Sequence, residues 1–184
     1  MLCLWAILRE NFVGSAKKPK SVKLIVGFIF REEAALTRTA KILEKRFGGI
    51  DFQSPCLNFA HTSFYEREFG NNLKRIFISF KKLIPPQSLA RIKIITNKIE
   101  QRLSLNTGRT INIDPGYLTQ AKLVLATTKD YMHRIYLGKG IYAEITLFFK
   151  DKSFRPWEWT YPDYKTEAYI AVFNQIREIY AQQI

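Results

Sequence analysis

The feature that most constrains the fold is an abrupt change of hydrophobic period early in the chain. Residues 23–30, KLIVGFIF, form an almost continuous apolar run. Its length and β-branched content favour a strand that is buried on both faces. In residues 31–48 the apolar side chains recur at helical spacing instead, and Gly48 and Gly49 end that pattern. A buried strand followed directly by an amphipathic helix is therefore predicted.

Strand and helix signals continue to alternate along the next part of the chain. We expect a second strand within 50–60 and a third over 73–80, where apolar residues alternate. Two prolines then precede a helix over 87–103, and a fourth strand follows at 109–113. The order β-α-β-β-α-β predicts an α+β fold with a ferredoxin-like core, in which two helices cover one face of an antiparallel sheet.

The rest of the chain extends this core. Residues 122–127 are expected to form a strand or a short buried helix. The segments 133–137 and 141–149 flank a glycine-containing loop and predict a β-hairpin. A closing helix is expected over 166–182, with Thr166 as its N-cap. The sequence thus predicts a C-terminal hairpin unit and a final helix added to the core.

We expect residues 1–20 to form an N-terminal extension and linker, and 21–184 to form a single α+β domain. No apolar run approaches the roughly 18 residues of a membrane span, so a membrane partner is not expected. Cys3 and Cys56 are too few for a disulfide framework and lack metal-ligand spacing. Two reduced thiols favour a cytoplasmic location.

The net charge points to an anionic partner. The chain carries 29 Lys and Arg against 16 Asp and Glu, a formal charge of +13. Such an excess bears on association with anions and carries no information about the fold. Most of it lies in residues 1–110, and residues 111–150 mix both signs. The charge therefore indicates a general attraction and does not by itself locate a site.

Polar residues that punctuate apolar strands are densest in 112–144, and the ends of strands are where a scaffold presents functional groups. One histidine and three carboxylates there have the chemistry of a general acid or base. These candidate catalytic residues are His133, Asp114, Asp130 and Glu144. Cationic and hydroxyl side chains of the same segment are suited to binding phosphate. These candidate ligand-binding residues are Lys122, Thr128, Lys129, Arg134, Tyr136 and Lys139.

Purely structural roles remain open for several of these residues. Asp114 begins an Asp-Pro-Gly sequence, which we expect to form a turn at the end of the fourth strand, and it can simply cap that turn. His133 can be a structural histidine in a β-rich segment. Glu144 needs no explanation if its face of the strand is solvated, and needs a partner such as Arg134 if that face is covered.

The leading functional hypothesis is a binder of a phosphorylated small molecule or nucleotide, acting through the polar cluster in 112–144. An enzyme acting on that ligand, with His133 and a carboxylate as the acid–base pair, is a close alternative. The cofactor is unknown, with a divalent metal such as Mg²⁺ accompanying a nucleotide as one option. No P-loop, GxGxxG or GxSxG motif is present, so these sites are not expected. A structural or interaction protein is a further alternative.

An RNA-binding module that uses the basic segment 61–110 is the alternative of a different class. The sequence Phe77-Ile78-Ser79-Phe80 matches the tail of an RNA-recognition signature, although packing in the core also accounts for these phenylalanines. Cationic residues around it can contact phosphates. They are Lys74, Arg75, Lys81, Lys82, Arg91, Lys93, Lys98 and Arg102.

Several longer motifs resemble a known family. They lie in segments 22–27, 74–80, 112–118, 125–144 and 159–164. Together they resemble the prokaryotic DUF4416 family, a domain of unknown function, over roughly residues 18–184. Some members carry a GTP-binding label, but this sequence lacks the motifs that support it. The resemblance therefore implies a family and no catalytic residues.

Overall fold

A computed structural model describes residues 14–59, 70–104 and 108–184. Within these residues the chain forms a mixed α+β fold built on one open sheet of nine strands, and its strand pairings are antiparallel. The order along the sheet is β2-β4-β1-β5-β6-β8-β7, with β3 beside β4 and β9 beside β8. In the part of the chain that the structure describes, no helix is long and apolar enough to cross a membrane.

Strand β1 (Lys23–Phe30) lies in the middle of the first half of the sheet. All eight of its residues are buried, which confirms the strand predicted from the apolar run. It pairs with β4 (Lys74–Phe80) on one side and with β5 (Ile111–Leu118) on the other. The predicted second strand is instead two short ones, β2 (Ile50–Gln53) and β3 (Leu57–Asn58), which both pair with β4.

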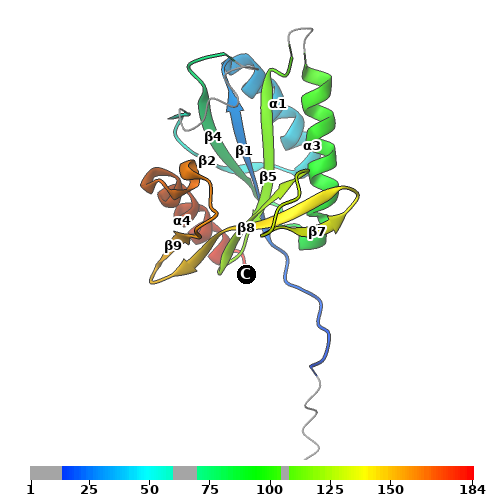
Figure 1. Ribbon diagram of the computed structural model, residues 1–184, viewed down its shortest axis with the longest axis vertical. Coiled ribbons are helices and arrows are strands. Elements are labelled where there is room, and N and C mark those ends of the chain that lie inside the picture. The colour runs from blue at the N-terminus through cyan, green and yellow to red at the C-terminus, as the bar shows by residue number, and fades with distance from the viewer. Residues whose placement is uncertain (1–13, 60–69, 105–107) are drawn as a thin grey trace, which may run out of the picture.

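Helices cover both faces of this half of the sheet (Figure 1). Helices α1 (Glu33–Phe47) and α3 (Leu89–Leu103) pack on the face that carries Val26 and Phe28. A short 3₁₀ turn, η1 (Pro86–Ser88), leads into α3. Helix α4 (Glu167–Ala181) packs on the opposite face, over Phe77. Because strand side chains alternate between faces, neighbouring residues of β1 and β4 enter two separate cores.

Helix α4 begins as the sequence predicted. The Tyr169 N–H donates to the Thr166 hydroxyl at the start of the helix, so Thr166 is the N-cap. Residues at helical spacing along α4 then fill the core between this helix and the sheet. They are Tyr169, Val172, Phe173, Ile176 and Tyr180.

The second half of the sheet is built around β8 (Ile141–Lys150). It pairs with β6 (Lys122–Thr127) on one side and with β7 (Ile135–Gly138) on the other, which confirms the predicted hairpin. Strand β9 (Ser153–Pro156) also pairs with β8 and was not predicted. A short 3₁₀ turn, η2 (Pro162–Lys165), joins this unit to α4.

Asp114, Pro115 and Gly116 lie inside β5, so the prediction that they form a turn after the fourth strand was wrong. Proline is tolerated there because Ile113, two residues earlier, directs its N–H away from β1, so the missing N–H of Pro115 faces the open side of the strand. Gly116 allows β6 to come close, because a Cβ at this position would lie 2.5 Å from the Val124 carbonyl oxygen.

The sheet opens between β5 and β6. The two strands pair only over Gly116–Leu118, so the first half of β5 has no strand beside it on that side among the described residues. Side chains of α3 complete its hydrogen bonds instead. The Ile113 N–H donates to Glu100 Oε1 at 2.6 Å, and Lys93 Nζ donates to the Ile113 carbonyl at 3.0 Å. This opening leaves a cavity beside α3.

Two sequence predictions lie partly or wholly outside the described residues. Of the predicted extension 1–20, residues 14–20 are described; they have exposed side chains, form no helix or strand, and run away from the folded body (Figure 1). Between the second and third predicted strands, the sequence also predicts a long connection over 61–72 with a helical turn, and most of this segment lies outside the described residues. The assignment of 21–184 as one domain stays a prediction.

Candidate functional site

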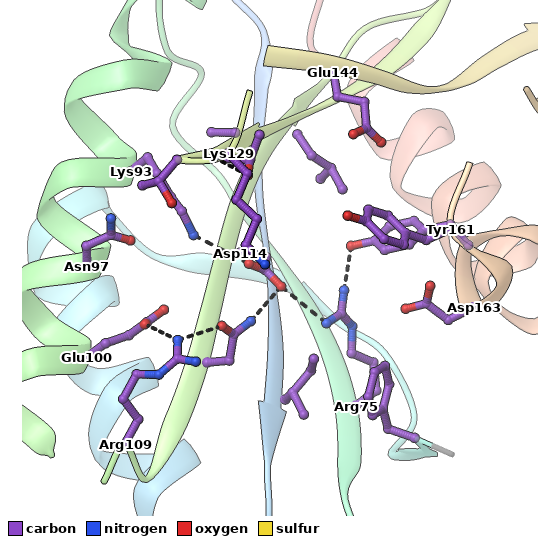
Figure 2. Close-up of a pocket in the computed structure, with 18 of the residues that line it drawn as sticks. Arg75, Lys93, Asn97, Glu100, Arg109, Asp114, Lys129, Glu144, Tyr161 and Asp163 are labelled. Carbon is purple, nitrogen blue, oxygen red and sulfur yellow. Dashed lines mark hydrogen bonds and ion pairs between the residues drawn. The ribbon is translucent and has the colours of Figure 1, made fainter. Parts of the chain in front are cut away.

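A cavity of about 720 Å³, here called the inner cavity, occupies the opening between β5 and β6. Its walls come from α3, from the end of β6 and the loop after it, and from the segment around η2 (Figure 2). The volume falls within the roughly 300–1,000 Å³ of small-molecule sites. The inner cavity is therefore large enough for a metabolite, and its lining decides which kind.

Asp114 lies on the floor of the inner cavity between two buried cations. Its Oδ2 accepts from Asn112 Nδ2 at 2.6 Å and lies 3.4 Å from Arg75 Nη1. Its Oδ1 lies 3.4 Å from Lys93 Nζ. The Asp114 side chain is 25% exposed, whereas those of Arg75 and Lys93 are 2% and 8% exposed. The carboxylate thus faces the inner cavity from between cations that approach it only at the outer limit of a hydrogen bond.

Arg75 is held in an aromatic surrounding. Its guanidinium carbon lies 4.8 Å from the centre of the Phe77 ring and 5.3 Å from that of Tyr164, and Nη2 donates to the Tyr164 hydroxyl. Burial by itself lowers the pKa of Arg75, but the electrostatic interactions with Tyr164 and Asp114 raise this pKa by more. The net pKa of Arg75 therefore lies above the usual value. Arg75 therefore stays a cation in the interior.

Glu100 and Arg109 form the side of the floor next to α3. Arg109 Nη1 lies 2.9 Å from Glu100 Oε2 and 3.1 Å from Asn112 Oδ1. Burial raises the pKa of Glu100, although the Lys93 charge and the hydrogen bonds from Ile113 and Arg109 act in the opposite direction. A hydrogen-bonded series therefore runs across the floor from Glu100 through Arg109 and Asn112 to Asp114 (Figure 2).

Arg134 joins the two loops at the rim. Its Nε donates to Glu144 Oε2 at 3.0 Å, its Nη1 to the Lys129 carbonyl at 3.0 Å, and its Nη2 to the Tyr161 hydroxyl at 3.0 Å. Burial lowers the pKa of Arg134, but the hydrogen bonds with Tyr161 and Glu144 raise it above the usual value. Glu144 is 3% exposed and pairs with Arg134. The sequence predicted such a partner for Glu144 if its face of the strand is covered.

His133 lies behind this rim, beside Glu144. Its Nε2 is 3.2 Å from Glu144 Oε2. Its ring stacks on Trp159 at 5.4 Å, and Trp159 stacks in turn on Trp157 at 5.1 Å. The stack on Trp159 orients the His133 ring toward Glu144. A second, more open hollow of about 970 Å³ adjoins this stack and is called the outer hollow.

The structure brings together most of the residues that the sequence singled out. Five of them line the inner cavity, namely Asp114, Thr128, Lys129, Arg134 and Glu144. His133 and Asp130 line the outer hollow, which shares Lys129, Arg134 and Tyr161 with the inner cavity.

Lys122, Tyr136 and Lys139 line neither space. Lys122 begins β6, and only the other end of that strand reaches the inner cavity. Tyr136 is exposed on β7, and Lys139 sits at the tip of the β7–β8 turn. These three residues were predicted to join the site because they are close to it in sequence, but they lie at other ends of the strands.

Several residues of the floor and rim are not among the site residues that the sequence predicts. They are Arg75, Lys93, Glu100, Arg109, Tyr161, Asp163 and Tyr164. One signal was present for Arg75, because it alternates with Phe77 and Ser79 on one face of a predicted strand. Once Phe77 is buried, a charged neighbour on the same face must be buried too and needs partners. Tyr161, Asp163 and Tyr164 come from segment 159–164, which carries part of the family resemblance.

The surface expected to bind RNA is smaller than the sequence indicated. Arg75 and Lys93 are buried, so they do not belong to it. Phe77 is also buried, with the ring of Phe173 from α4 at 4.9 Å, so it is not available to stack on a base. Among the described residues of 61–110, the cations classed as exposed are Lys81, Lys82, Arg91, Lys98 and Arg102.

In the part of the chain that the structure describes, no group of three His, Cys, Asp or Glu side chains is arranged to hold a metal ion. The expected option of a divalent metal with a nucleotide therefore has no ready protein ligand set among those residues. A metal would have to draw its other ligands from water and from the phosphates of the nucleotide.

The fold and the inner cavity define a class of protein: an α+β domain with a charged cavity of metabolite size where its sheet opens. The chain belongs to the DUF4416 family, a domain of unknown function, whose model matches residues 20–180. Neither the curated proteins nor the solved structures contain a significant match.

Proposed function

We propose that the protein binds a small phosphorylated molecule in the inner cavity. The observation that carries this proposal is the pair of buried cations around Asp114. Arg75 and Lys93 are each 3.4 Å from a carboxylate oxygen of Asp114, a long contact for an ion pair, and both cations line the inner cavity. An anionic group in the inner cavity would attract both cations strongly, because the dielectric constant there is low.

The overall charge of the lining supports the same conclusion. Five cations line the inner cavity, namely Arg75, Lys93, Arg109, Lys129 and Arg134. Four carboxylates accompany them, namely Glu100, Asp114, Glu144 and Asp163. The lining therefore carries a small positive excess. The mixture of signs also suits a ligand that has hydroxyl or amino groups beside its phosphate.

The loop after β6 supplies groups for the outer end of such a ligand. Thr128 and Lys129 are exposed and line the inner cavity. A threonine hydroxyl and a lysine ammonium both donate to phosphate oxygens. Arg134 is already committed to three acceptors, so we assign it to fixing the rim and Lys129 to contacting the ligand.

The test is a thermal-shift and calorimetric screen of nucleotides and sugar phosphates, each paired with its dephosphorylated form. Ligands that bind the native state raise Tm. We expect phosphorylated members to raise Tm and their dephosphorylated counterparts to bind at least tenfold more weakly, since charge-assisted hydrogen bonds are worth roughly 1.5–3 kcal/mol. Lys129→Gln should weaken the binding that the screen detects.

Lys139→Gln is the matched control, because it removes one exposed lysine that lies outside the inner cavity. The proposal is overturned if no phosphorylated compound binds. It is also overturned if Lys129→Gln and Lys139→Gln reduce the affinity equally, because a general surface attraction would then explain the binding.

A second candidate function is proton-transfer chemistry on a ligand that extends from the inner cavity into the outer hollow, favoured by the contact between His133 Nε2 and Glu144 Oε2 at 3.2 Å. A carboxylate that orients an imidazole is a common arrangement for a general acid or base. The test is turnover of any ligand found in the screen, with His133→Gln compared with wild type. Turnover that His133→Gln leaves unchanged would overturn this candidate.

We further infer a ferredoxin-like arrangement for the first half of the sheet. The order β2-β4-β1-β5, with antiparallel neighbours, supports it, as does the packing of α1 and α3 on a shared core. A cytoplasmic location is proposed on the same footing. The exposed free thiol of Cys56 supports it, because free thiols persist in a reducing compartment.

A further inference from the structure

Large apolar side chains are exposed mainly in one region of the molecule. Of the nine exposed large hydrophobic residues in the described chain, seven lie in segments 131–137 and 159–161. The stack of His133 on Trp159 and the hydrogen bond from Arg134 to Tyr161 join these two segments. The seven residues, here called the edge patch, are Tyr131, Met132, Ile135, Tyr136, Leu137, Trp159 and Tyr161.

The edge patch contains an unpaired strand edge. Strand β7 is the last strand on its side of the sheet, and within the described residues only β8 pairs with it. Its residues Ile135, Tyr136 and Leu137 are exposed although they are apolar. Edge strands of isolated domains usually carry charges, prolines or covering loops that prevent further pairing. The β7 sequence, IYLG, has no charge and no proline.

The size of the edge patch matches one side of a stable interface. The exposed fractions of its residues add up to about four whole side chains, on the order of 800 Å² at roughly 200 Å² each, divided between the two faces of the edge because neighbouring side chains of β7 alternate. A standard interface buries about 800 Å² on each partner. Patches of this size on soluble domains mark interaction sites more often than chance exposure.

The local charge favours a protein partner over a nucleic acid. Around the edge patch the exposed cations Lys129, Lys139 and Lys165 stand beside Asp130 and Glu158, a local excess of one charge, although the whole chain carries +13. A nucleic-acid surface needs a larger excess of positive charge. Trp159 already stacks with His133 at 5.4 Å and with Trp157 at 5.1 Å, so its ring is engaged within the protein. Aromatic residues, methionine and isoleucine with few charges are typical of the centre of a protein interface.

We propose that the edge patch binds a second copy of this chain, through antiparallel pairing of β7 with β7 of the partner. A two-fold axis places the same surface on both copies, so an uncharged edge meets an uncharged edge and its apolar side chains meet each other. The pairing continues the sheet across the two chains and satisfies the outer backbone groups of β7. This inference does not depend on any ligand of the inner cavity.

The test is sedimentation of the full chain over a concentration series, with Ile135→Lys and Leu137→Lys beside wild type. We expect wild type to change from the 21.5 kDa monomer to a dimer of twice that mass as the concentration rises. Each variant places a lysine on the edge strand and should raise the dissociation constant at least tenfold, about 1.4 kcal/mol. Hydrogen exchange should show β7 amides that are protected in the dimer and exchange in the monomer.

Ile42→Lys is the matched control, because it replaces an exposed isoleucine on α1, outside the edge patch. It should dimerise as wild type does. The proposal is overturned if wild type stays monomeric up to submillimolar concentration. It is also overturned if Ile42→Lys weakens the dimer as much as Ile135→Lys, or if β7 amides exchange equally in monomer and dimer.

Discussion

Arg75 and Asp114 face each other across β1. Their strands, β4 and β5, pair with opposite edges of β1, and the two side chains meet over Gly27. Arg75 Nη1 lies 3.4 Å from Asp114 Oδ2. Gly27 makes room for this approach, since a Cβ there would lie 3.1 Å from Arg75 Nη2 and 2.9 Å from the Phe77 ring. The ion pair thus depends on a missing side chain in the strand between its partners.

Replacing Arg75 with methionine should destabilise the fold strongly. The substitution leaves Asp114 with one cation fewer and removes the guanidinium from its aromatic surrounding, and breaking a buried pair from one side costs about 3–5 kcal/mol. We expect about 3 kcal/mol in urea unfolding, because Asp114 keeps Lys93 and Asn112. Lys74→Met is the control. Lys74 is the preceding residue, pairs with Glu33 at the surface, and should change the unfolding free energy far less.

Asp114→Asn should tighten the binding of a phosphorylated ligand, if the inner cavity holds one. The amide keeps the shape of the side chain but withdraws the negative charge that a phosphate must approach, while Arg75 and Lys93 remain. We expect a several-fold lower dissociation constant by calorimetry, and Lys93→Met should raise it. Weaker binding by Asp114→Asn would show that the carboxylate itself contacts the ligand.

Arg134→Gln should loosen both loops at the rim together. Arg134 connects the Lys129 carbonyl to the Tyr161 hydroxyl and holds Glu144, so its loss releases the loop after β6 and the segment before η2. We expect faster hydrogen exchange in 128–133 and in 157–161, with little change in β1. Arg155→Gln, an exposed arginine on β9, serves as the control and should leave both segments as they are in wild type.

The sequence was a better guide to the elements than to the site, and the reason is physical. Local period predicted β1, α1, α3 and α4, since each depends on which face of a short segment meets the core. The floor of the inner cavity depends on where β6 leaves β5, which long-range pairing decides and no local pattern encodes. Asp114-Pro115-Gly116 shows this most clearly. The sequence is typical of a turn, yet its proline faces an open edge and its glycine admits a neighbouring strand, so β5 continues through it.

Gly116→Ala should therefore destabilise the junction of β5 and β6. The added Cβ would lie 2.5 Å from the Val124 carbonyl oxygen and 2.7 Å from a Leu125 methyl group, and a backbone atom cannot move away cheaply. We expect a loss of about 1–3 kcal/mol in urea unfolding, the usual range for overpacking. Gly49→Ala is the control, because its Cβ would meet only the Lys81 side chain at 3.5 Å. Equal effects of the two substitutions would contradict the close approach at Gly116.

Glu100 should make stability fall as the pH rises, because burial raises its pKa above that of a free glutamate. Below the free value, about 4.3, both the folded and the unfolded chain hold the proton. As the pH rises from there through the raised folded pKa, the unfolded chain releases it first, and the folded state loses stability relative to a neutral side chain. The unfolding free energy of wild type minus that of Glu100→Gln should therefore decrease between pH 4 and pH 7.

Glu178→Gln, which removes an exposed carboxylate on α4, is the control for losing one charge. A difference for Glu100→Gln that is flat, or that increases with pH, would show that the Lys93 and Arg109 interactions outweigh burial.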